Sequence, residues 1–74
     1  MALPILNWRE VVKALAKRGF KPVRQRESHI IVENLEGRLV VVPRHNQIKR
    51  RTLMSIIEQA GLTKDEFIKL LEEG

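Results

Sequence analysis

Apolar residues near the start of the chain recur at the spacing of one helix face. The side expected to face a core carries five residues: Trp8, Val11, Val12, Leu15 and Ala16. Asn7 and Glu10 have the three-residue spacing of a capping box, in which each side chain accepts a hydrogen bond from the other residue's backbone amide. Gly19 then suits the position just past a helix C-terminus. The pattern predicts a helix from about Asn7 to Gly19.

Three runs in the middle of the chain are typical of strands: residues 20–26, 28–33 and 38–42. The four residues 34–37 make a good hairpin connection and end in glycine. Pro22 has no amide hydrogen to donate to a ladder, so the first strand should lie at an edge. Short links between the runs predict an antiparallel sheet with its strands in sequence order.

The remaining apolar residues return to helical spacing. Residues 52–60 place four of them inward, Leu53, Ile56, Ile57 and Ala60, before Gly61 ends the helix. Thr63 and Glu66 repeat the capping-box signal before a last amphipathic helix, whose apolar residues are Phe67, Ile68, Leu70 and Leu71. We therefore expect one domain over residues 1–74, of α+β class, with element order α-β-β-β-α-α and the helices on one face of a three-stranded antiparallel sheet.

Alternation along the second strand separates two faces. Ile30 and Val32 share the face that the helices should cover, and His29, Ile31 and Glu33 share the open one. The third strand is apolar on both faces. These are more apolar side chains than one covered face needs, which suggests that a partner or a second copy of the chain covers the open face.

The charge is unevenly distributed. Residues 1–51 hold twelve Lys and Arg against four Glu, whereas residues 52–74 hold two Lys against five acidic residues. This asymmetry favours a polyanionic partner on the first part of the chain.

Composition narrows the alternatives further. The chain has no cysteine, and its two histidines have no nearby cluster of ligand residues, so we expect neither a disulfide nor a metal site, and no cofactor. No apolar run reaches the roughly 20 residues that span a bilayer, and the first residues do not resemble a secretory signal. We therefore expect a cytoplasmic protein without a membrane partner.

Residues 24–29, Arg-Gln-Arg-Glu-Ser-His, combine two arginines, a hydroxyl and an imidazole directly before an apolar strand. Arginine can hold a phosphate while a near-neutral base takes a proton from a neighbouring hydroxyl. RNA carries such a hydroxyl beside each phosphate, so one base and several cations suffice for in-line cleavage to a 2′,3′-cyclic phosphate without metal. This segment predicts a phosphodiester substrate.

The same residues carry a resemblance to a known family. Five short motifs occur here in the order typical of HicA-type toxins: Gly19-Phe20, Arg24-Gln25, Ser28-His29, Gly37-Arg38 and Val42-Pro43-Arg44-His45. Thr52-Leu53, Ile56 and Gln59-Ala60-Gly61 extend the resemblance, which covers residues 8–62. It implies an α-β-β-β-α fold similar to the double-stranded-RNA-binding domain and an mRNA-cleaving ribonuclease. It also implies a HicB-type antitoxin as partner and His29 as the catalytic residue.

Two positions depart from the family pattern. Glu27 stands where the family has glycine before Ser-His, and Arg51 stands where it has glycine before Thr-Leu. Glycine beside a catalytic histidine lets a phosphate backbone approach closely. The carboxylate of Glu27 should repel phosphate, whereas the surrounding arginines should attract it.

The other candidate site residues are cationic or polar. The expected phosphate contacts are Arg24, Arg26, Ser28, Arg44, Lys49, Arg50 and Arg51. For Ser28 the alternative is equally favoured, that it simply begins the strand. His45 could protonate the leaving 5′-oxygen or bind phosphate, but the favoured interpretation is that its side chain anchors the loop through a hydrogen bond to backbone. Trp8 and Phe20 could stack on bases, but their helical spacing and capping context favour the core.

Three functions fit this sequence: a small ribonuclease toxin, a non-catalytic RNA-binding module of the same fold, and a protein-interaction domain without RNA affinity. The first predicts metal-independent RNA cleavage that is lost in His29→Ala. The second predicts salt-sensitive RNA binding without cleavage, and the third predicts no RNA binding at all.

Overall fold

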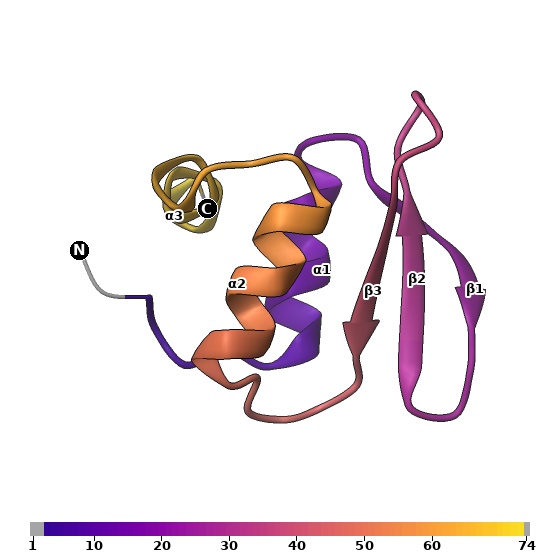
Figure 1. Cartoon of the computed structure of the whole chain (residues 1–74), viewed down its shortest axis with the longest axis horizontal. Coiled ribbons are helices and arrows are strands. Elements are labelled where there is room, and N and C mark those ends of the chain that lie inside the picture. The colour runs from indigo at the N-terminus through magenta and orange to yellow at the C-terminus, as the bar shows by residue number, and fades with distance from the viewer. Residues whose placement is uncertain (1–2, 74) are drawn as a thin grey trace.

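The computed structural model describes residues 3–73 and contains the predicted elements in the predicted order. They are α1 (Trp8–Ala16), β1 (Lys21–Gln25), β2 (His29–Glu33), β3 (Leu39–Pro43), α2 (Arg50–Gln59) and α3 (Lys64–Glu72). Figure 1 shows the sheet on one side, α1 and α2 packed beside it, and α3 beyond them. The three strands are antiparallel in the order β1-β2-β3, so the α+β prediction with helices on one sheet face is confirmed.

The N-terminus of α1 is capped as the sequence predicts. The Asn7 side chain accepts a hydrogen bond from the Glu10 amide at 2.9 Å, and the Glu10 carboxylate accepts one from the Asn7 amide at 3.0 Å. Both groups satisfy donors that a helix start otherwise leaves free. The predicted inward face needs one correction, because Ala14 is buried and Ala16 is exposed. Ala14 is three residues after Val11 and directly before Leu15, which are both buried, so it lies on the same core-facing side of the helix.

Both helix stops use glycine in the left-handed conformation. Gly19 has φ 82°, and the amides of Gly19 and Phe20 donate to the carbonyls of Ala16 and Leu15. This pair of bonds is the Schellman pattern, and Gly61 ends α2 in the same way with φ 72°. In the first case the turn delivers Phe20 into the core, where its side chain is 1% exposed.

Each edge strand of the sheet has a local feature that hinders further strand pairing. On β1, Pro22 offers no amide hydrogen and the register shifts between Pro22 and Arg24, which indicates a bulge. On β3, the Val41 amide donates to the side-chain oxygen of Gln59 on α2 at 3.0 Å. The prediction that the strand with Pro22 lies at an edge is confirmed.

One core lies between the sheet and the helices. Its sheet side consists of alternate residues that are at most 5% exposed: Ile30, Val32, Val40 and Val42. On the opposite face, His29 and Leu39 are exposed and Ile31 is partly so. The helices therefore cover the Ile30/Val32 face, as predicted, and His29 lies on the open one.

The segment before α2 differs from the prediction. The helix begins at Arg50, two residues before the predicted start at Thr52, and its N-cap Lys49 makes no side-chain capping bond. Ile48, inside a stretch without evident pattern, is 1% exposed and forms a bridge with Leu6, where its amide donates to the Leu6 carbonyl at 2.7 Å. One buried side chain and one backbone bond fix this otherwise polar loop.

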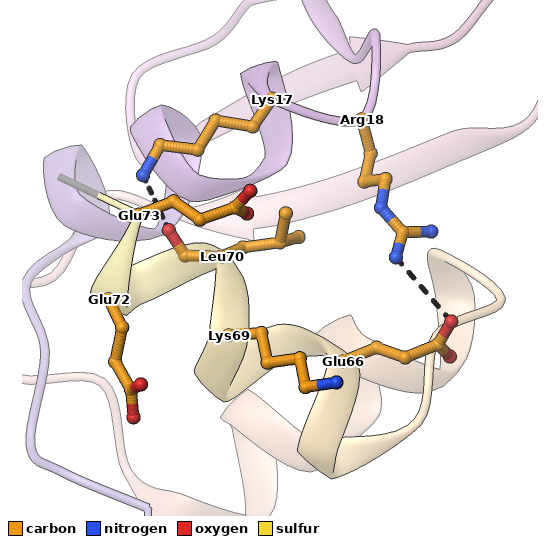
Figure 2. Close-up of a pocket in the computed structure, with 7 residues that line it drawn as sticks. All are labelled: Lys17, Arg18, Glu66, Lys69, Leu70, Glu72 and Glu73. Atoms are coloured by element: carbon orange, nitrogen blue, oxygen red, sulfur yellow. Dashed lines mark hydrogen bonds and ion pairs between the residues drawn. The ribbon is translucent and has the colours of Figure 1, made fainter.

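The last helix packs on the helix layer rather than on the sheet. Phe67, Ile68 and Leu70 are buried, and Figure 2 shows two polar links from the end of α1 to α3. The Lys17 amine donates to the Leu70 carbonyl, and Arg18 pairs with Glu66 at 3.5 Å. Since the last carbonyls of a helix lack partners within it, the Lys17 bond satisfies one of them. No helix within residues 3–73 is long and apolar enough to span a membrane.

Candidate functional site

Four chain segments meet at one end of the molecule. Figure 1 shows the β1–β2 turn, the end of β3 and the starts of α1 and α2 at the lower end, away from α3. This end gathers seven of the predicted site residues: Arg26, Ser28, His29, Arg44, Lys49, Arg50 and Arg51. The fold therefore brings the cationic segments 24–29 and 44–51 to the same end, although 14 residues separate them in the sequence.

The turn that presents His29 is a two-residue hairpin. The Arg26 amide donates to the His29 carbonyl at 2.9 Å, and the His29 amide donates to the Arg26 carbonyl at 3.4 Å, which leaves Glu27 and Ser28 as the loop. Neither loop residue has a positive φ, unlike the glycine-rich turns that hairpins of this length prefer. Glu27 thus lies in the turn and not on the strand, so strand pairing does not hold its carboxylate on the face of His29.

Two arginines share the open face with His29. Arg26 stands opposite His29 across the ladder, and Arg24 pairs with Ile31, the next residue on that face. Directly opposed side chains start about 4.5–5.5 Å apart and diagonal ones about 7–8 Å apart, both within reach of an arginine. His29, Arg24 and Arg26 are all exposed. The sheet therefore displays an imidazole and two guanidinium groups together to solvent.

Ser28 contacts the His29 ring. Its Oγ lies 3.0 Å from Nδ1, so one of these two atoms donates a hydrogen bond to the other. This contact differs from both roles expected for Ser28, a hydrogen bond to phosphate and the start of the strand. The bond occupies Nδ1 and leaves Nε2 as the ring nitrogen available to a substrate.

Arg44 joins the site through its backbone. Its amide donates to the Ser28 carbonyl at 2.8 Å, one step beyond the pairing of His29 with Pro43. The side chain follows the inward alternation of β3, and its guanidinium carbon lies 5.1 Å from the centre of the Trp8 ring. Arg44 thus follows the residue that pairs with His29 in the β2–β3 ladder, but its side chain lies on the other face of the sheet.

Trp8 and Phe20 have different surroundings. Phe20 is buried in the core, as predicted, whereas Trp8 is half-buried and packs against the core edge. The Arg9 guanidinium carbon lies 4.6 Å from the Trp8 ring centre, within cation–π distance, as does that of Arg44. Arg9 is not among the residues predicted for the site. Its position becomes noteworthy only in the folded chain, where Arg44 packs against the same ring.

His45 contacts its neighbours through its main chain. Its carbonyl accepts a hydrogen bond from the Trp8 amide at 3.1 Å, and its own amide donates to the Pro43 carbonyl at 2.9 Å. The side chain is exposed and makes no hydrogen bond within residues 3–73. The prediction that the His45 side chain anchors its loop is therefore wrong, because the backbone of His45 links the end of β3 to the start of α1 and its imidazole is exposed to solvent.

Three further cations mark the beginning of α2. Lys49, Arg50 and Arg51 are exposed, and the first turn contains no acidic residue. Cations oppose the dipole at this end of a helix, and here no side chain caps the free amides either. Across the described chain, residues 3–73, the one ion pair is Arg18–Glu66, so the cations at this end have no carboxylate partner.

Comparison with known proteins agrees with this architecture. A solved chain from a toxin–antitoxin complex of Streptococcus pneumoniae superposes with a TM-score of 0.69 and 31% sequence identity, covering 77% of this chain and 98% of its own length. No curated protein sequence gives a significant match. The family model for the HicA toxin of bacterial toxin–antitoxin systems matches residues 8–62, from the start of α1 to just past α2. The chain therefore belongs to the HicA toxin family.

Proposed function

We propose that this protein is a ribonuclease toxin that cleaves mRNA, with His29 as its general base. The observation that carries the proposal is the exposed imidazole on the open sheet face beside Arg24 and Arg26. Membership of the HicA toxin family supports the same reaction. Because the proposed substrate is mRNA, we expect the protein to act in the cytoplasm.

The reaction needs little more than a base and cations. Nε2 of His29 takes the proton from a ribose 2′-OH, and the 2′-oxygen forms a bond to phosphorus as the bond from phosphorus to the 5′-oxygen breaks. The products are a 2′,3′-cyclic phosphate and a 5′-hydroxyl, which receives its proton from solvent or from His45. A positioned base contributes about 10² to 10⁴ in rate.

The contact of His29 with Ser28 supports this role for Nε2. When Nδ1 carries the proton and donates it to Ser28 Oγ, Nε2 has a free lone pair and can act as a base. After proton transfer, the same bond stabilises the imidazolium, because both ring nitrogens are then donors. In this role Ser28 is a positioning residue for the histidine.

The arginines supply the charge that the phosphate needs. Arg24 and Arg26 lie on the face of His29 and would contact the scissile phosphate, where charge increases in the transition state. Lys49, Arg50 and Arg51 would bind phosphates further along the strand of RNA. Each neutralised phosphate should make binding more sensitive to salt, with a slope of about 0.7 per contact for a single strand.

A HicB-type antitoxin is the partner that we propose for the open face. The similar chain from Streptococcus pneumoniae was solved in a toxin–antitoxin complex. The open face of this sheet combines the exposed apolar residues Leu39 and Val41 with the exposed His29. Co-expression with the product of a neighbouring HicB-like gene should yield a stable complex in which RNA cleavage is inhibited. Unimpaired cleavage by that complex would exclude neutralisation.

The direct test uses two RNAs of one sequence, one unmodified and one 2′-O-methylated, incubated with purified protein in EDTA. The proposal predicts cleavage of the unmodified RNA to 2′,3′-cyclic phosphate ends and no cleavage of the methylated RNA. Cleavage of both, or cleavage that stops in EDTA, would contradict the mechanism.

Binding of RNA without any cleavage would instead support a non-catalytic RNA-binding module. Glu27, which replaces the family glycine, is the specific reason to consider this second function. Glu27→Gln removes the charge alone, and Glu27→Gly also restores the small residue of the family. Recovery of cleavage in the second variant only would show that close approach of the phosphate, and not charge repulsion, limits the reaction.

A further inference from the structure

A cluster of Trp8, Arg9 and Arg44, which we name the Trp8 cluster, lies at the site end but outside the group around His29. The two guanidinium carbons lie 4.6 Å and 5.1 Å from the centre of one indole ring. Arg9 comes from the first turn of α1, and Arg44 from the residue after β3. The ring therefore holds together two cations that are 35 residues apart in the sequence.

Neither arginine of the Trp8 cluster forms an ion pair within the described residues. Two positive charges on one ring repel each other, so a bound anion would stabilise the pair. Within residues 3–73 the only ion pair is Arg18–Glu66, which belongs to the α1–α3 contact. Glu10, next to Arg9 in the chain, directs its Oε1 to the Asn7 amide as part of the helix cap.

Arg44 is also fixed in place. Its Nε is buried and has no hydrogen-bond partner within the described residues, and its backbone amide donates to the Ser28 carbonyl at 2.8 Å. Stacking on an aromatic ring orients a guanidinium group before any ligand arrives, which lowers the entropy lost on binding. An anion that binds here would meet a preorganised donor.

The cluster is tied to the site by backbone hydrogen bonds. The Trp8 amide donates to the His45 carbonyl at 3.1 Å, and Arg44 follows Pro43, the ladder partner of His29. A chain of RNA whose scissile phosphate lies at His29 can continue round the end of β3 to this ring. Charge favours a polyanion here, because the cluster belongs to the part of the chain with twelve cations and four acids, and the backbone links to the proposed site at His29 favour RNA over an acidic protein.

We infer that the Trp8 cluster is a second phosphodiester subsite, in which Arg9 and Arg44 bind a backbone phosphate of the RNA other than the one that is cleaved. The inference rests on the proposed ribonuclease function, which it extends from one phosphate to two. Trp8 itself stacks on guanidinium groups and not on a base, and it acts by positioning both arginines.

The single tryptophan makes this subsite measurable, since all tryptophan emission reports on Trp8. We would titrate the full chain with a short 2′-O-methyl RNA, which binds without being cleaved, and follow both emission and affinity. The wild type should show a saturable change in emission. Arg9→Gln and Arg44→Gln should each bind about tenfold more weakly and with a shallower salt slope.

Matched variants keep the test independent of folding and of the chemistry. Lys69→Gln removes an exposed cation from α3, at the end of the molecule away from the cluster, and should bind as the wild type does. Arg44→Lys keeps the charge but loses the planar fork, so it should restore the salt slope without the full affinity. His29→Ala should lose cleavage and keep both the emission change and the affinity.

Each remaining outcome decides against one of the two proposals. Unchanged binding by Arg9→Gln and Arg44→Gln would overturn the subsite while leaving His29 as the base. Cleavage by His29→Ala would overturn the proposed chemistry while the emission change still supports the subsite. An emission response to polyglutamate but none to the RNA would overturn the phosphate assignment in favour of an acidic protein ligand.

Discussion

At His29 the two ring nitrogens have different environments, and this difference is the basis of the proposed chemistry. Nδ1 lies 3.0 Å from Ser28 Oγ, whereas the ring as a whole is exposed. A base that must accept a proton at one nitrogen benefits when the other nitrogen has a fixed hydrogen-bond partner. Ser28 provides that partner from the adjacent position in the hairpin turn.

Replacement of Ser28 tests this arrangement. Ser28→Ala should lower kcat between about tenfold and a hundredfold because the imidazole loses its preferred orientation and tautomer. KM for RNA should change little, since the arginines remain. Ser28→Thr keeps the hydroxyl and should retain most of the activity. A large rise in KM with unchanged kcat would assign Ser28 to phosphate binding instead.

At the scale of elements, both capping boxes and both glycine stops could be predicted from local sequence. Asn7 with Glu10 and Thr63 with Glu66 form the predicted reciprocal bonds. The start of α2 could not be predicted in this way, because the residue directly before Arg50 is Lys49 and not a Ser, Thr, Asp or Asn that would signal it. The burial of Ile48 also escaped prediction, since it depends on a bridge to Leu6, distant in sequence.

The uncapped start of α2 implies a conflict between stability and binding. Lys49 has the extended backbone of an N-cap residue but no capping side chain. Lys49→Ser should therefore stabilise the fold by about 1 kcal/mol, because its hydroxyl can accept from the first-turn amides. The same change should weaken RNA binding by removing a phosphate contact. Chemical denaturation and RNA titration of the variant measure the two effects, and a loss of stability would contradict the capping argument.

The cap of α3 makes a contribution to stability that depends on pH. The Thr63 backbone hydrogen bond, with smaller effects from the Thr63 side chain and Arg18, lowers the pKa of Glu66 below its ordinary value. Because the unfolded chain then binds this proton first, the stabilisation is present above about pH 4.5 and is lost as pH falls through the lower folded pKa. Urea unfolding of the wild type and Glu66→Gln should converge in acid. A difference that is constant with pH would contradict this assignment.

At the scale of the whole molecule, the cationic residues of the site and the helix from the acidic part of the chain lie at opposite ends. The cationic end is the lower end in Figure 1, where the sheet meets the starts of α1 and α2, and α3, from the acidic part of the chain, lies beyond α1 and α2 at the upper end. RNA should therefore approach the cationic end, away from α3. The family match ends at residue 62, before α3 begins at Lys64, so this third layer lies outside the matched segment.

The contribution of α3 to stability can be measured at Phe67, which is completely buried. Phe67→Ala should cost about 3–5 kcal/mol, a large part of the stability of a domain of this size. Leu35→Ala, at a fully exposed hairpin position, is the matched control and should change stability by less than about 0.5 kcal/mol. Thermal unfolding compares them, and similar melting of both variants would show that α3 is not part of the cooperative fold.

The site itself was predictable only in part. The segment 24–29 and its histidine could be recognised because a hairpin turn keeps neighbours in sequence together in space. The contact between Arg44 and Trp8 joins the end of β3 to the start of α1, so it depends on the packing of two elements. No local pattern contains that information.

The central claim is that His29 performs the cleavage, and the most direct test is the RNase activity of His29→Ala beside the wild type, in EDTA, on one RNA. Because the side chain is exposed, the variant should keep its circular dichroism spectrum and its melting temperature. The account predicts no cleavage above background by the folded variant and cyclic phosphate ends from the wild type. Cleavage by His29→Ala at the wild-type rate would contradict it.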